Sequence, residues 1–210
     1  MRIRHPPGRS GRLWLIDRLA VAERAASILH RKHQALRQEE IRLAALTERS
    51  AAAWTTAVRD AEEWQRQAMI LGARSDLRAA TTLVRPASAR VVWRTEMGVE
   101  IPAEASCDLP PTAPTPGTPA LASATAAYRH ALEAAVEHAA VTNAAARVGT
   151  ELVVTQQRLR AVRDRWIPAL QDALQLLELR LDDHDREELS RSRAHRRNAT
   201  PSASSMEEQP

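Results

Sequence analysis

The feature that most constrains this chain is a heptad repeat of apolar residues between residues 13 and 71, which no proline or glycine interrupts. Its positions step by four and three, which places them on one side of an α-helix. A narrow apolar stripe sustained over so many turns predicts a long helix that packs against a second helix as a coiled coil. The large residues in this seam are Leu15, Leu19, Leu29, Leu36, Leu43, Trp54 and Trp64.

A second repeat near the other end of the chain supplies the partner helix, which we expect over residues 120–197. Pro168 lies inside this repeat, where it removes a backbone donor and clashes with the preceding turn. The spacing of the apolar residues also changes there, so we expect a kink near Trp166. The seam residues of this helix are Leu152, Leu159, Val162, Trp166, Leu170, Leu177 and Leu181.

The segment between the repeats, residues 73–119, has a different character. Gly72 ends the first repeat, as a helix C-terminal cap would. Met97 and Gly98 lie between two short alternating runs and predict the turn of a β-hairpin, with strands near 90–95 and 99–101. Residues 103–119 are rich in Pro, Thr and Ala, and we expect a flexible or partly extended surface loop that contains Cys107.

Together these segments predict an all-α fold, a long antiparallel two-helix coiled-coil hairpin with a small β-hairpin and loop insertion. Both termini would lie at one end of the coiled coil and the insertion at the other. The expected divisions are a basic N-terminal arm (1–12), an N-terminal coiled-coil helix (13–72), the insertion (73–119), a C-terminal coiled-coil helix (120–197) and a disordered tail (198–210).

The residues give no sign of catalytic chemistry. A phosphate loop needs glycines before Lys-Ser/Thr, and the chain's only lysine, Lys32, has no such setting, so we expect no ATP hydrolysis. No catalytic, cofactor or metal residues are expected. The single cysteine rules out an internal disulfide. No apolar run approaches the roughly 18 residues of a membrane span, so we expect no direct membrane insertion.

Three blocks of sequence resemble the D-subunit family of V-type and archaeal-type (A-type) rotary ATPases, in its bacterial form. The first is Pro7-Gly8-Arg9-Ser10 with the leucines that follow, and the second is the hairpin sequence from Met97 to Pro102. The third and most specific runs from Thr155 through Ile167-Pro168 to Arg186-Glu187-Glu188. The order and spacing of the blocks agree with the family over nearly the whole chain.

This resemblance implies a non-catalytic central-stalk rotor that transmits torque between a nucleotide-binding ring and an ion-translocating membrane rotor. It would thereby couple ATP synthesis or hydrolysis to proton or sodium transport. The implied partners are the catalytic and non-catalytic ring subunits, the small F subunit of the central stalk and a membrane-side coupling subunit. The implied location is cytoplasmic, peripheral on the inner face of the cell membrane.

Arginines near the two termini are the candidate contacts with the ring, because guanidinium groups suit acidic or carbonyl-lined surfaces. They are Arg9, Arg12, Arg191, Arg193, Arg196 and Arg197. One alternative is a cytosolic coiled-coil adaptor unrelated to rotary ATPases, but it leaves the ordered three-block match unexplained. Another is a basic rod that binds nucleic acid or an anionic membrane. The net charge of +4 is too mild for it, and Asp and Glu dilute every long stretch.

Overall fold

The structure, a computed structural model, describes residues 3–74, 76–77, 85–111 and 118–198. The chain divides into two compact units: unit 1 is Met1–His30 with Gln157–Pro210, and unit 2 is Arg31–Gln156. The helices are α1 (Gly8–Ile70), α3 (Pro119–Arg160), the π-helical segment η1 (Ala161–Trp166) and α4 (Ile167–Asn198), and the strands are β1 (Ser88–Glu96) and β2 (Val99–Asp108). The predicted all-α coiled-coil hairpin with a small β-hairpin is confirmed.

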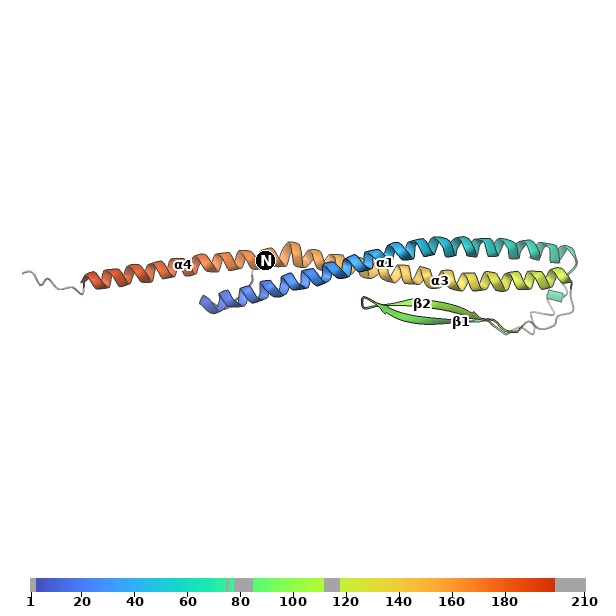
Figure 1. Cartoon of the computed structure of the whole chain (residues 1–210), viewed down its shortest axis with the longest axis horizontal. Helices are drawn as coiled ribbons and strands as arrows, with labels where there is room; N and C mark the ends of the chain where they lie inside the picture. Colours follow the sequence, from blue (N-terminus) through green and yellow to red (C-terminus); the bar gives the residue numbers. More distant parts are fainter. Residues whose placement is uncertain (1–2, 75, 78–84, 112–117, 199–210) are drawn as a thin grey trace, which may run out of the picture. The chain divides into compact units, whose positions relative to one another are not determined.

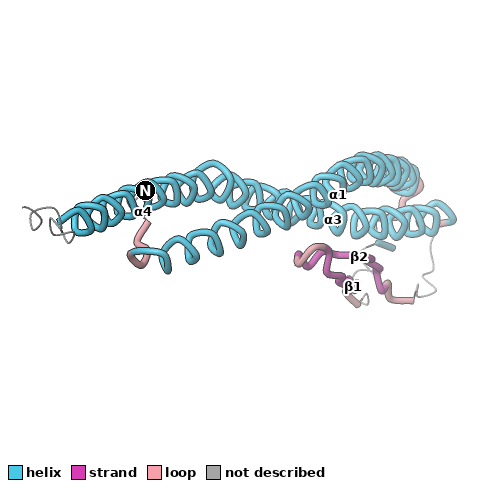
Figure 2. The backbone as a smooth tube through the Cα atoms, turned by 60° about the vertical axis from the view of Figure 1, so that its left-hand side comes forward, coloured by secondary structure: helices cyan, strands magenta, loops and turns pink. Residues whose placement is uncertain are grey.

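In unit 2, α1 and α3 run antiparallel and side by side (Figure 1 and Figure 2). Small residues fill the contact toward the end of α1, where Ala57 and Ala61 meet Ala131. Larger residues fill it farther from that end. There the buried cluster is Leu36, Leu43, Ile101, Ala144, Val148 and Leu152. Alanine at the contact lets two helix backbones approach closely, which explains why a chain so poor in aromatics can still pack.

Helix α1 ends in a Schellman motif. The amide of Ala73 donates to the carbonyl of Ala68 at 3.1 Å, and the amide of Gly72 donates to that of Met69 at 3.2 Å. Gly72 has φ +86°, a conformation that glycine adopts without a Cβ penalty. Ala68 and Ala73 also share a buried cluster, which is the apolar contact typical of this cap.

The β-hairpin is longer than predicted. Its two-residue turn has positive φ at both Met97 (49°) and Gly98 (79°), as a type I′ turn requires. The register shifts between Val92 and Trp93, where Pro102 lies opposite Trp93 at a bulge. A proline without an amide hydrogen is tolerated there. A flexible or partly extended loop was expected from residue 103, but residues 103–108, with Cys107, are extended as part of strand β2 and are not a loop. Residues 112–117 lie outside the described part of the chain.

In unit 1, the first turns of α1 pack against α4. Leu15 and Ala22 meet Leu170 and Leu177 in a buried cluster, and Leu19, Val162, Leu174 and Leu181 pack against it. The arm expected over residues 1–12 is shorter, since α1 already begins at Gly8. Ile3 of this arm packs against the same cluster. Glycine at position 11 allows the N-terminal arm to take this path, because a Cβ there would lie 1.9 Å from the carbonyl oxygen of Pro6.

The change of apolar spacing near Pro168 takes the form of the π-helical segment η1. The amide of Ile167 donates to the carbonyl of Val162, five residues back. The packed residues accordingly step by five, from Val162 to Ile167, and then resume at Leu170 and Leu174. Trp166 therefore does not lie in the seam as expected: it is 37% exposed, and Ile167 packs in its place. A wider turn also separates the proline ring from the carbonyl four residues back.

Two other tryptophans expected in the seam lie outside it. Trp54 is 39% exposed, and its ring stacks on His138 with 5.4 Å between centroids. Trp64 is 40% exposed. The neighbouring alanines Ala57, Ala61 and Ala68 are buried instead. Where alanines bring the two helices close together, no space remains between them for an indole ring. The rings of Trp54 and Trp64 therefore lie at the edge of the helix–helix contact.

Candidate interaction surfaces

The β-hairpin docks against the helix pair through an apolar contact. Ile101 of β2 is fully buried (0% exposed) in the cluster formed by Leu36, Leu43, Val148 and Leu152, and Val99 packs beside it. Strand β1 has the opposite character, since every residue from Ser88 to Thr95 is exposed. The buried apolar contact with the helices is therefore made by β2, whereas the side chains of β1 remain largely exposed.

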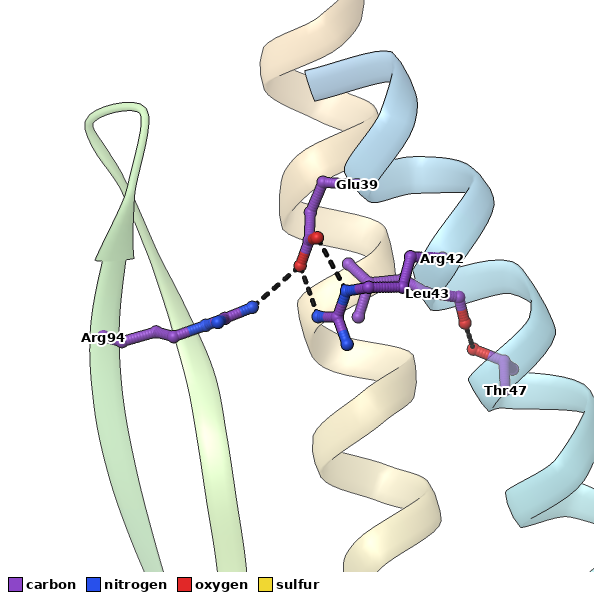
Figure 3. A network of polar contacts seen from close by, with 5 residues as sticks. All are labelled: Glu39, Arg42, Leu43, Thr47 and Arg94. Atoms are coloured by element: carbon purple, nitrogen blue, oxygen red, sulfur yellow. Dashed lines mark hydrogen bonds and ion pairs between the residues drawn. The ribbon is translucent and has the colours of Figure 1, made fainter. Parts of the chain in front are cut away.

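The carboxylate of Glu39 on α1 also holds the hairpin, at the same level of the helix as the contact with Ile101. Figure 3 shows Arg94 reaching from β1 to Glu39, whose Oε1 accepts from Arg94 Nη2 at 2.8 Å. The Nε of Arg42 donates to the other oxygen of Glu39 at 2.7 Å. The hydrogen bond from Arg42 holds the pKa of Glu39 below its usual value, and desolvation opposes this in part. The hydrogen bond to Glu39 in turn raises the pKa of Arg42. The Glu39 side chain is only 13% exposed, so this contact is shielded from solvent more than a surface ion pair.

A second basic side chain holds the hairpin from α3. The Nη1 of Arg147 donates to the carbonyl of Glu100 at 3.1 Å, and its guanidinium lies 4.7 Å from the ring centroid of Trp93. One arginine thus contacts both strands, by a hydrogen bond to β2 and a cation–π contact to β1.

The chain's only lysine lies near the hairpin turn and joins the two helices. Lys32 Nζ donates to Glu151 Oε1 at 2.7 Å, and both side chains are about a quarter exposed. A Cβ added at Gly98 would lie 4.0 Å from this nitrogen. The turn formed by Met97 and Gly98 therefore lies close to the Lys32–Glu151 ion pair.

The terminal arginines do not form one free basic surface. Arg9 lies 3.7 Å from Asp185, and Arg12 Nε donates to Glu178 Oε1 at 2.8 Å, so both pair α1 with α4. Arg191 contacts Glu187 one turn earlier at 3.2 Å. Arg193 and Arg196 are exposed on α4, and Arg197 belongs to the same helix. The charges of Arg9 and Arg12 are therefore partly neutralised by carboxylates of the same chain.

Four arginines outside the expected set lie at the junction of α3 and η1. Arg158 and Arg160 are in the last turn of α3, and Arg163 and Arg165 are in the last turn of η1. All four are exposed. No residue of η1 is buried. The sequence does carry a signal for them, since four arginines in eight residues stand beside one acid, Asp164. Only the structure gives their exposure.

Two further observations concern the described residues. They contain no group of three or more His, Cys, Asp or Glu placed to hold a metal ion. None of their helices combines the length and the apolar character that a membrane crossing requires.

The paired helices, the docked hairpin and the charged surfaces define a helical coiled-coil protein. The chain belongs to the ATP synthase D-subunit family, whose sequence model matches residues 13–196. A search of curated proteins finds no match. Family membership makes this chain a stalk subunit of a rotary ATPase, involved in ATP synthesis and ion transport, and a partner of other ATP synthase subunits.

Proposed function

We propose that the chain is the central rotor axle of a V/A-type ATPase, itself non-catalytic, and that it transmits torque between the nucleotide-binding ring and the membrane rotor. The observation that carries this proposal is the family match over residues 13–196 on a chain whose helices pair in both units. An axle must resist twisting. In this chain, buried side chains hold the paired helices together.

The packing within each unit suits this role. In unit 1, Leu15 and Leu170 are fully buried between α1 and α4. In unit 2, Leu36 and Val148 are fully buried between α1 and α3. Sliding one helix past the other would pull these side chains out of the holes they fill, at a cost of about 2–5 kcal/mol for each large residue lost from its site. Torque applied to one helix is thus passed to its partner.

We assign the ends of the axle as follows. The terminal part, with α4 and the start of α1, enters the ring of catalytic and non-catalytic subunits, where Arg191, Arg193, Arg196 and Arg197 are candidate contacts. The end of α1 meets the membrane-side coupling subunit. In support, Ile70 (83% exposed) and Leu71 (60% exposed) offer apolar surface at that end of the helix. The small F subunit binds the side of the coiled coil, and this chain lies in the cytoplasm, peripheral on the inner face of the cell membrane as part of the complex.

Co-purification with two truncations tests this assignment. Removing residues 1–12 together with 190–210 is expected to weaken binding to the ring and to lower the coupled ATPase rate. Removing residues 109–117, which leaves both strands whole, is expected to spare ring binding. The opposite result, in which only the deletion of residues 109–117 abolishes ring binding, would show that the axle is oriented the other way.

The non-catalytic assignment has its own test. The isolated chain is expected to show no ATP hydrolysis and no tight ATP binding, because no phosphate loop is present in the sequence. Activity that survives purification and changes with point substitutions in this chain would contradict the proposal.

A further inference from the structure

The four arginines at the junction of α3 and η1, Arg158, Arg160, Arg163 and Arg165, form what we term the basic collar. With Asp164 counted, their net charge is 4 − 1 = +3. Within the described part of the chain, none of the four has an ion-pair or hydrogen-bond partner for its side chain. The nearest acid in sequence, Asp164, is itself exposed and makes no ion pair among the described residues.

Several other arginines of unit 1 do have carboxylate partners. Arg9 and Arg12 are paired with Asp185 and Glu178, and Arg191 is paired with Glu187. Helix α4 supplies these partners because it carries an acidic run, whereas residues 156–167 supply only Asp164. Arg160 and Arg163 are three positions apart, a spacing at which like charges on a helix repel each other, and no carboxylate of the described residues pairs with any of the four arginines. An external acid would relieve this repulsion.

The chemistry of the collar favours a carboxylate-bearing partner. Arginine presents a planar fork that binds a carboxylate through two hydrogen bonds, and its charge persists at every physiological pH. An acidic protein segment can place separate carboxylates around Asp164. The continuous phosphate charge of a nucleic acid would instead be repelled at that point. All four arginine side chains are exposed and thus accessible to such a partner.

We propose that the basic collar is a binding surface for an acidic segment of a neighbouring protein subunit of the complex. This rests on the proposed function, because the neighbour is a subunit of the ring through which the axle passes. The contact is made by Arg158, Arg160, Arg163 and Arg165 and precedes the terminal arginines along the helix. The collar, rather than Arg9 and Arg12, is then the main electrostatic contact, since those two are already paired within the chain.

The test measures binding of the full chain to the assembled ring at several NaCl concentrations. Replacing all four collar arginines with glutamine is expected to raise Kd about tenfold or more at low salt, by analogy with exposed ion pairs. It should also make the dependence of Kd on salt shallower. The matched control replaces four exposed arginines of unit 2, Arg31, Arg49, Arg59 and Arg74, with glutamine. The control is expected to stay within about twofold of the wild type.

Several outcomes would overturn the proposal. They are wild-type binding by the collar variant, an equal loss in both variants, or tight binding of a labelled oligonucleotide that competes with the ring and requires the collar. Circular dichroism checks that each variant keeps its helix content. A lysine version of the collar keeps the charge and must retain most of the salt dependence if charge is the cause. A wild-type chain that fails to bind the ring at all would overturn the proposed function itself, which is a different result.

Discussion

Replacing Ile101 with alanine is expected to release the β-hairpin from the helices while leaving the helices paired. Ile101 is fully buried, and its neighbours come from α1 (Leu36, Leu43) and α3 (Val148, Leu152). Those helices are packed against each other independently of the hairpin, so they cannot collapse into the space that the side chain leaves. The hairpin has no other buried residue among its two strands.

The magnitude follows from the buried side chain. Removing three carbons from a fully buried isoleucine costs about 2–4 kcal/mol when the surroundings cannot close the cavity. The contacts of Arg94 and Arg147 remain, and each contributes about 0.5–1 kcal/mol or somewhat more. The free energy for opening the hairpin locally should therefore fall by about 2–4 kcal/mol, which speeds hydrogen exchange roughly thirtyfold to several hundredfold.

Hydrogen exchange followed by mass spectrometry measures this directly. Peptides covering residues 88–108 should lose protection in the Ile101→Ala variant, while peptides covering α1 and α3 keep theirs. Val91→Ala is the control, because Val91 lies on the exposed strand and should change protection little. Equal loss of protection over the hairpin and both helices would refute the reasoning, since it would mean that Ile101 holds the helices together. Unchanged hairpin protection would refute it too.

Three further predictions concern single positions. The pKa of Glu39 is lowered in the folded chain, so its contribution to hairpin docking is full above its ordinary value of 4.5 and is lost as pH falls through the lower folded pKa. Amide NMR shifts of the hairpin should report this transition, and Glu39→Gln should remove it. Pro168→Ala should stabilise unit 1 by about 1–2 kcal/mol in urea unfolding, because it restores a backbone donor. The π turn should persist, since the packed residues still step by five. Gly11→Ala should expose the N-terminal arm to proteases, because its Cβ would overlap the carbonyl oxygen of Pro6; unchanged cleavage would contradict this.

Much of the fold could be predicted because the heptad repeat is a local pattern that directly specifies helix pairing. The cap at Gly72 and the turn at Gly98 were predictable for a similar reason, since each needs a positive φ that glycine adopts readily. The bend expected at Pro168 stays a prediction. The structure adds two features that the repeat does not predict. A π turn accommodates the five-residue step between Val162 and Ile167, and Ile167 replaces Trp166 in the seam.

The interaction surfaces were less predictable because they depend on tertiary contacts. Nothing in the strand sequence states that Ile101 inserts between two helices or that Glu39 binds Arg94 across 55 residues of chain. Strand length was underestimated because Pro102 interrupts the alternating pattern, while the structure accommodates it at a bulge. The pairing of Arg9 with Asp185 likewise requires the register of α1 and α4, which the sequence gives only approximately.

The π turn also has a genetic consequence. Losing one codon within residues 119–160 would rotate every later residue of α3 by about 100° and turn the apolar stripe away from α1. Losing one codon within residues 161–166 would instead shorten the step between Val162 and Ile167 from five to four, the spacing of an ordinary α-helix. Single-residue length changes in this helix are therefore expected to be tolerated at η1 and rejected along α3.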